Sequence, residues 1–275
     1  LVLGIDYGTE RDPVIQIYDR PGDPGDWTLI HTESIPEYLG YRPRLWGVHF
    51  DEGRLLLSLD TFLDDGSERV FGWISIRERD GNGAWPQSAT LPEDPFASMY
   101  ADFRFGEYLS AHEGTLLATI PGYEANPDSA QIYAYNMGGY ALEKVFDTQS
   151  PENDLFGIDS DINDDFVALI HPGVGIYAMP RSGGSVGELS AVSADSLFDV
   201  DHTPHYTVAL GGMGQQGWLA ATVELTPASG FGYTEVVVFQ YSGSTLTPKL
   251  TIGSQDPSGD ANFFGTVLDW SGDTL

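Results

Sequence analysis

Short runs of alternating apolar and polar residues recur along this chain, separated by clusters of Gly, Asp, Ser and Pro. An alternation of period two predicts β-strands with one face buried, and the intervening residues are those that form tight turns. The clearest runs predict strands at residues 14–20, 70–79, 130–136, 174–180 and 235–242. Each run is followed by a short turn and a further strand. We therefore expect an all-β chain of antiparallel hairpins with essentially no helix.

An aromatic-Gly step marks the start of a repeating unit. It occurs at Trp46-Gly47, Phe105-Gly106 and Phe156-Gly157, and a fourth unit starts at Tyr206. A fifth unit starts at Phe264 and continues from the C-terminus into the N-terminal sequence LVLGIDYG. The starts are 59, 51, 50 and 58 residues apart. A strand-filled period of this length is typical of a propeller blade.

Four strands in each unit predict a five-bladed β-propeller that forms a single domain over residues 1–275. Each blade is expected to be a four-stranded antiparallel sheet. One unit is divided between the two ends of the chain. The C-terminal strand 264–270 is therefore expected to pair with the N-terminal strand 1–5 and close the ring.

The net charge of −29, from 41 acidic and 12 basic residues, excludes two classes of partner. A surface this negative repels phosphate backbones and anionic lipid headgroups, so we expect neither nucleic acid nor an acidic membrane as a partner. The chain has no cysteine, which excludes disulfides and thiolate metal sites. No apolar run reaches the roughly 18 residues that span a bilayer, so membrane insertion is not expected.

The divided unit resembles the FG-GAP repeat of bacterial extracellular β-propellers. It reads TLTPKLTIGSQDPSGDANFFGTVLDWSGDTL, followed by LVLG at the N-terminus. The FG-GAP repeat has an outer strand, an acidic Gly-rich loop, Phe-Gly, an apolar strand, a Gly-Asp turn and an apolar strand ending in Gly. The unit at 105–136 is similar, and the others are less so. The resemblance implies an extracellular or cell-surface protein related to the integrin head, and leaves open that the ring belongs to a larger surface polypeptide.

The resemblance also implies a calcium site, because integrin-like copies hold calcium in the turn between their first two strands. One turn here has a similar composition, and its candidate ligands are Asp159, Asp161, Asn163 and Asp165. Calcium takes about six to eight oxygen ligands, which alternating Asp and Asn side chains supply. This turn lacks the Gly that folds such a loop around an ion, so an ordinary acidic hairpin turn is the alternative interpretation. The corresponding FDEG and AHEG sequences predict ordinary hairpin turns.

Aromatic residues in the loops between second and third strands predict a binding face. These loops emerge on one face of a propeller, and aromatic rings there stack on sugars or anchor a protein partner. The residues are Tyr7, Phe62, Tyr123, Phe231 and Tyr233. Packing on neighbouring blades is the alternative role for each of them. We therefore expect a non-enzymatic interaction or adhesion module that binds a glycan or a protein.

The alternative function is that of a glycoside hydrolase, because five-bladed propellers include such enzymes and these use paired carboxylates. The candidate acids for a central funnel are Asp6, Asp60, Asp102, Asp159 and Glu224. With 41 acidic residues, carboxylates near a funnel are expected by chance. No nucleophile elbow, phosphate-binding loop, dinucleotide fingerprint or zinc-protease motif occurs. The close pair His202 and His205 would need further ligands to bind zinc.

Overall fold

The computed structural model describes residues 2–5, 12–19, 26–37, 43–62, 69–91, 105–120, 129–136, 139–147, 157, 159–171, 175–182, 185–186, 190–193, 202–211, 216–225, 233–242 and 245–253. These residues form strands and turns without a helix, which confirms the all-β prediction. Among them, no helix has the length and apolar character needed to cross a membrane. The predicted closing strand 264–270 lies outside the described residues.

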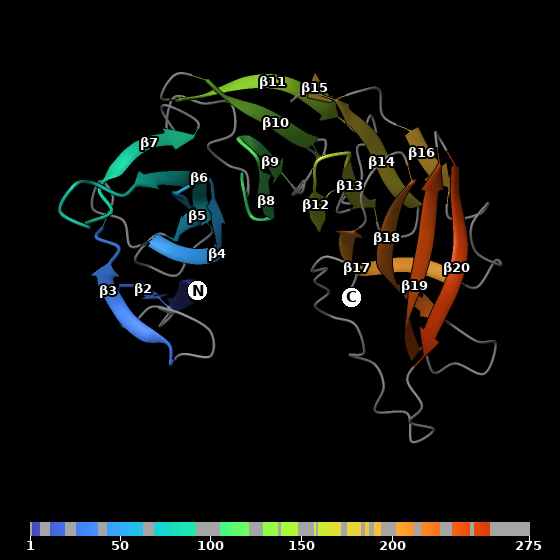
Figure 1. Ribbon diagram of the computed structural model, residues 1–275, viewed down its shortest axis with the longest axis horizontal. Coiled ribbons are helices and arrows are strands. Elements are labelled where there is room, and N and C mark those ends of the chain that lie inside the picture. Colours follow the sequence, from blue (N-terminus) through green and yellow to red (C-terminus); the bar gives the residue numbers. More distant parts are fainter. Residues whose placement is uncertain are drawn as a thin grey trace.

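The strands form five antiparallel sheets that follow one another along the chain (Figure 1). Sheet 1 contains β1 (Val2–Ile5), β2 (Val14–Asp19) and β3 (Thr28–Ser34). Sheet 2 contains β4 (Pro43–Asp51), β5 (Arg54–Phe62), β6 (Arg69–Glu78) and β7 (Gln87–Leu91). Sheet 3 contains β8 (Leu109–His112), β9 (Thr115–Ile120), β10 (Ser129–Asn136) and β11 (Gly139–Asp147).

The remaining strands belong to sheets 4 and 5. Sheet 4 contains β12 (Ser160–Ile162), β13 (Phe166–His171), β14 (Gly175–Ser182), β15 (Ser185–Val186) and β16 (Ser190–Ser193). Sheet 5 contains β17 (His202–Gly211), β18 (Gln216–Leu225), β19 (Tyr233–Ser242) and β20 (Thr245–Gly253). The five strands predicted from the clearest alternating runs are β2, β6, β10, β14 and β19, so all five are confirmed.

The outer strand of sheet 4 differs from its prediction. The sequence predicts one strand over 186–193, whereas two short strands, β15 and β16, both pair with β14. They pair with opposite ends of β14, on either side of Met179 and Pro180. Proline has no N–H to donate to a ladder, so a strand beside it loses a hydrogen bond at that point.

The first strands of sheets 2 to 5 lie towards the middle of the molecule, and the last strands lie outside (Figure 1). Strand β4 contacts β8, β8 contacts β12, and β12 contacts β17. On the other side, β4 contacts β1 of sheet 1. The sheets are therefore arranged in series around a common centre.

Apolar side chains on both faces of the middle strands form the core between the sheets. In β5, Leu55, Leu57 and Leu59 pack with the isoleucines of sheet 1, whereas Leu56 packs with sheet 3. Successive strand residues point to opposite faces, so the continuous apolar run in β5 serves two interfaces. Strand β13 behaves in the same way and is buried along its whole length. In a sheet that is buried on both faces, each strand has a continuous run of apolar residues in its sequence. In a sheet with one exposed face, apolar and polar residues alternate along the strand.

The Phe-Gly steps bring the backbone of one sheet close to the preceding sheet. Gly106 has φ +72° and donates its N–H to Thr119 of its own sheet, while a Cβ there would lie 2.7 Å from Ile74 of sheet 2. Gly157 has φ +76°, and a Cβ there would lie 2.7 Å from Thr119 of sheet 3. A positive φ favours glycine, and so does the lack of space. This repeated signature is therefore a structural device for packing sheets.

Buried arginines add polar ties between sheets. Arg77 on β6 donates to the carboxylate of Glu33 on β3, which connects sheets 2 and 1. Arg54 lies 3.3 Å from Asp51, and Asp51 in turn accepts the backbone N–H of Gly114 in sheet 3 at 3.0 Å. Burying a charge is tolerated when it is paired and hydrogen-bonded. These hydrogen bonds therefore connect sheet 2 to sheets 1 and 3.

Candidate functional site

The aromatic-Gly step of sheet 2 is built differently from the other two. Phe105 is fully buried, whereas Trp46 on β4 is 39% exposed. Gly47 meets only ordinary contacts, since a Cβ there would lie 3.8 Å from Ser58. The β4–β5 ladder shifts register between Leu45 and Gly47, which places Trp46 at a bulge. Bulges commonly redirect a side chain near a functional site, so Trp46 does not pack in the core as Phe105 does.

Two neighbours hold the exposed indole of Trp46. Its Nε1 donates to the Asp60 carboxylate at 2.5 Å, and the Arg44 guanidinium lies over the ring, 4.0 Å from its centroid. Arg44 also donates to the same Asp60 oxygen, at 3.2 Å. Asp60 is fully buried on β5, so its position is fixed by the sheet. The three side chains form a closed polar triangle around a partly exposed aromatic ring.

Asp60, one of the candidate funnel acids, does not face solvent. Its carboxylate is 0% exposed and already accepts from Trp46 and Arg44. Asp159 is partly exposed, and its backbone carbonyl accepts from Ile170. Glu224 lies within β18, but its side chain is not described. Asp6 and Asp102 lie outside the described residues. Within the described part of the chain, Asp60 is therefore a positioning group for Trp46.

The structure does not describe the side chain of any of the five aromatic residues that are predicted to lie in loops. Tyr7, Tyr123 and Phe231 lie outside the described residues. Phe62 is the last residue of β5 and Tyr233 the first of β19, so the backbone of each is described and its side chain is not. Both mark the connection between the second and third strands of their sheets. Because Asp60 precedes Phe62 by two residues, the Trp46 group lies towards the same end of sheet 2 as that predicted loop.

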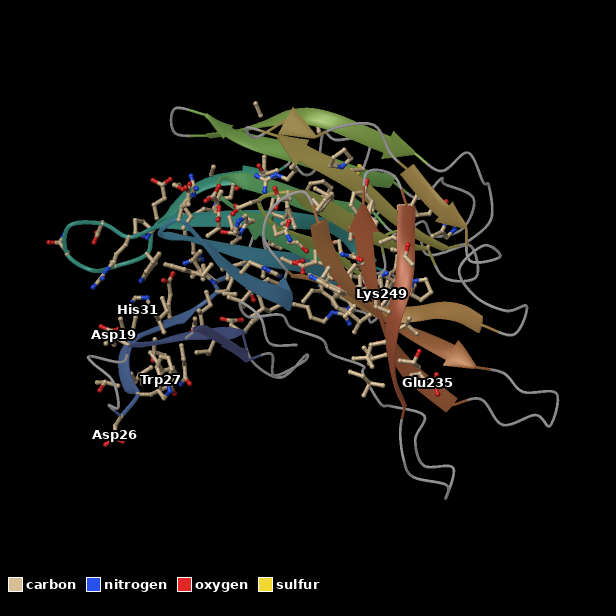
Figure 2. All side chains as sticks on the ribbon, turned by 45° about the vertical axis from the view of Figure 1, so that its right-hand side comes forward. Asp19, Asp26, Trp27, His31, Glu235 and Lys249 are labelled. Atoms are coloured by element: carbon tan, nitrogen blue, oxygen red, sulfur yellow. The ribbon has the colours of Figure 1, made fainter. Side chains whose placement is uncertain are left out.

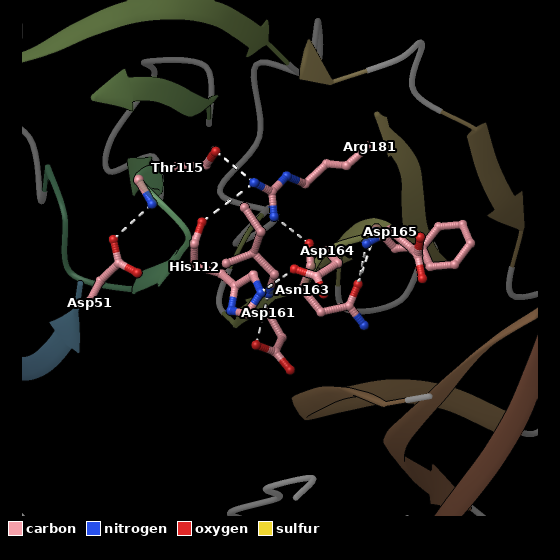
Figure 3. Close-up of polar contacts among 11 residues, drawn as sticks. Asp51, His112, Thr115, Asp161, Asn163, Asp164, Asp165 and Arg181 are labelled. Atoms are coloured by element: carbon pink, nitrogen blue, oxygen red, sulfur yellow. Dashed lines mark hydrogen bonds and ion pairs between the residues drawn. The ribbon is translucent and has the colours of Figure 1, made fainter. Parts of the chain in front are cut away.

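The turn predicted to bind calcium is a tight hairpin between β12 and β13. Asn163 Oδ1 accepts the backbone N–H groups of Asp165 and Phe166, at 3.0 and 2.9 Å (Figure 3). This is the usual role of Asn at the first position of a turn. Asp161 Oδ1 accepts from the N–H of Ile162. Calcium binding at this turn stays a prediction, and it would have to draw on an Asn163 oxygen that already accepts two hydrogen bonds.

The hairpin turns of sheets 2 and 3 match the sequence-based expectation. The FDEG and AHEG sequences form two-residue loops closed by the pairs Asp51–Arg54 and His112–Thr115. The central residues all have positive φ, with 45° at Glu52 and 46° at Glu113. Two central residues with positive φ define the type I′ turn, whose twist suits a hairpin.

A second polar group joins the turns of sheets 3 and 4. His112 Nε2 lies 2.7 Å from Asp164 Oδ1, and this hydrogen bond is the main reason why the pKa of Asp164 is lowered (Figure 3). Arg181 on β14 is buried and donates to the Asn163 carbonyl and, at 2.8 Å, to Thr115 Oγ1. The sequence gives no signal for this contact, since the partners are about 50 to 70 residues apart and belong to different repeats.

Burial lowers the pKa of His49 on β4, so this imidazole is neutral in the folded protein at neutral pH. The unfolded chain takes up a proton near the ordinary value of 6.5, and the folded chain does so only at lower pH. Stability is therefore expected to fall as the pH drops below 6.5. In the His49→Gln variant, the part of this loss of stability that comes from His49 should be absent. Urea unfolding of both proteins from pH 7.5 to 5 checks it, and an unchanged difference in unfolding free energy across that range would contradict it.

No protein-family model and no curated protein matches the sequence of this chain. Among solved structures, the chain is similar to the GH43_1 enzyme from Xanthomonas citri, whose crystal structure contains xylose. The likeness covers 74% of this chain and 72% of that one, with 12% sequence identity and a TM-score of 0.35. At this level the likeness carries no argument about function. The chain's own residues have to supply that argument.

Proposed function

We propose that this protein is an extracellular or cell-surface interaction module, a five-bladed β-propeller that binds a glycan or a protein on one face. Five sheets in series with adjoining first strands support the propeller arrangement. So does sheet 5, where Ala220, Val236 and Val238 are buried on the face opposite to sheet 4. Ring closure would place strand 264–270 beside β1.

The observation that carries the proposed binding role is the held, partly exposed Trp46. A large aromatic side chain loses little conformational entropy on binding when it is already fixed, and here Asp60 and Arg44 fix it. An exposed indole stacks on the apolar face of a sugar ring or inserts into a partner's pocket. A role in packing alone would bury the ring, as in Phe105. Trp46 therefore serves as the anchor of the proposed binding face.

Glycan binding gives a direct test with a matched control. Trp46→Ala should weaken binding to any glycan that the wild-type protein retains on an array by at least about tenfold, as expected for an interface hot spot. Trp27→Ala removes a tryptophan of similar exposure, 51%, from the outer edge of sheet 1 (Figure 2) and should leave the affinity unchanged. Titration calorimetry on the retained glycan measures both.

The same experiment separates the two function classes. Binding without release of sugar supports the interaction module. Release of reducing sugar from the bound glycan would support the glycoside hydrolase instead. Equal loss of affinity in the Trp46 and Trp27 variants would contradict the assignment of Trp46 as the anchor.

A further inference from the structure

The turns of sheets 3 and 4 bring one imidazole and two carboxylates together. His112 and Glu113 belong to the β8–β9 turn, and Asp164 belongs to the β12–β13 turn. One donor atom from each lies within 4.8 Å of the other two. The strands of sheet 2 carry Trp46 near one end and the Glu52 turn at the other, and Asp51 beside that turn contacts Gly114. This group is therefore at the opposite end of the strands from Trp46.

The backbone on either side of the group is fixed independently of these three side chains. Arg181 donates to the carbonyl oxygens of His112 and Asn163 and to Thr115 Oγ1, and so ties the two turns together (Figure 3). On the other side, the Asp51 carboxylate accepts the N–H of Gly114. The three donors are thus held by a buried framework although they themselves are half-buried or exposed. Preorganisation of this kind lowers the entropic cost of binding a ligand.

The imidazole distinguishes this group from the acidic side chains found all over this chain. A neutral imidazole nitrogen is a preferred ligand for zinc and similar transition metals, whereas calcium and magnesium prefer oxygen alone. One tetrahedral ion with bonds of about 2.0–2.2 Å needs its nitrogen and oxygen ligands about 3.5 Å apart, which small rotations of these side chains reach because their donors already lie within 4.8 Å of one another. One oxygen of the Glu113 carboxylate also lies within 4.8 Å of one oxygen of the Asp164 carboxylate. Two like charges in contact are relieved when a cation lies between them.

We propose that His112, Glu113 and Asp164 bind a zinc ion that bridges sheets 3 and 4. The three protein ligands leave the fourth tetrahedral position for water. The two carboxylates of the group supply two negative charges, which match the charge of a divalent cation. The ion connects two sheets that also share a cluster of apolar side chains and the hydrogen bonds of Arg181, and it therefore stabilises the folded protein.

Zinc titration of the chelator-treated full chain tests the proposal. One zinc ion per chain should bind and raise the melting temperature, and calcium or magnesium at equal ionic strength should raise it less. His112→Gln keeps a hydrogen-bonding side chain beside Asp164 but removes the imidazole. It should weaken zinc binding by at least about tenfold. With Cu²⁺ in place of zinc, nitrogen coupling in the electron paramagnetic resonance spectrum should be present in the wild-type protein and absent from this variant.

His31→Gln provides the matched control. His31 also lies beside a carboxylate, Glu33, at 3.2 Å on the outer strand of sheet 1 (Figure 2), without being part of the three-donor group. Zinc affinity should be unchanged in this variant. The proposal would be overturned by a zinc affinity that His112→Gln leaves intact, by an equal loss in His31→Gln, or by a melting temperature that responds more to calcium than to zinc.

Discussion

Gly106→Ala is expected to lower the free energy of unfolding by about 3 kcal/mol. A left-handed backbone costs a non-Gly residue about 1–2 kcal/mol, and Gly106 has φ +72°. The added Cβ would also lie 2.7 Å from Ile74, which is fully buried and branched at its own Cβ, so it has no room to move. Overpacking of this kind costs about 1–3 kcal/mol. Urea unfolding measures the change.

Gly53→Ala separates the two contributions. Gly53 has φ +79°, similar to Gly106, but nothing lies within 4 Å of a Cβ built there. The Gly53→Ala substitution should therefore lower the free energy of unfolding by only about 1 kcal/mol, because only the backbone conformation opposes it. Gly157→Ala, whose Cβ would meet Thr119 at 2.7 Å, should behave like Gly106→Ala. If all three variants lose the same stability, close contact between sheets is not what requires glycine in the Phe-Gly step.

Arg181→Met is expected to destabilise the protein by about 3 kcal/mol, because it leaves buried oxygens without their charged donor. Arg181 is 8% exposed and joins the turns of sheets 3 and 4 through Asn163 and Thr115. Methionine retains much of the aliphatic length, so lost packing contributes little. Arg79 is exposed, and Arg79→Met should change stability by no more than about 0.5 kcal/mol.

Equilibrium unfolding of the two arginine variants in urea gives the comparison. A loss in Arg181→Met that matches that of Arg79→Met would show that the tie between the two turns does not contribute to stability. Arg181→Lys offers a further check. It keeps the charge but loses the planar fork that reaches several acceptors at once, so its stability should lie between those of the wild type and Arg181→Met.

Local patterns predicted the strands well because each sheet is made of consecutive segments. Pairing within a hairpin depends on residues that are close in the sequence. The alternation of apolar and polar residues in β2 is therefore enough to predict that strand, and the Glu-Gly step before Arg54 is enough to predict the turn between β4 and β5. The glycines of the Phe-Gly signature, Gly106 and Gly157, both have positive φ and precede the first strands of sheets 3 and 4. These features depend on residues that are neighbours in the sequence, so they can be predicted from the sequence alone.

The candidate site was less predictable because it depends on contacts between repeats and on departures from the repeat. Trp46 occupies the same position in its repeating unit as Phe105, yet it lies at a bulge, donates to Asp60 and is partly exposed. Asp60 was a candidate for the funnel and is instead buried. The tryptophan in place of phenylalanine, with an arginine two residues earlier, was the available signal. Contacts such as that of His112 with Asp164 leave no trace in one sequence.

The burial of basic and acidic side chains in equal number, within the described part of the chain, leaves a strongly negative field around the protein. Three of its 12 basic residues, Arg54, Arg77 and Arg181, are withdrawn from solvent to tie strand ends together. Asp51, Asp60 and Glu107 are buried as well, so among the described residues burial leaves the large excess of negative charge at the surface as the composition gives it. At physiological ionic strength the field of such a surface extends about 8 Å before it is screened. We therefore expect sulfated or uronate-rich glycans to be repelled within that layer, whereas neutral sugars should not be repelled and basic proteins should be attracted.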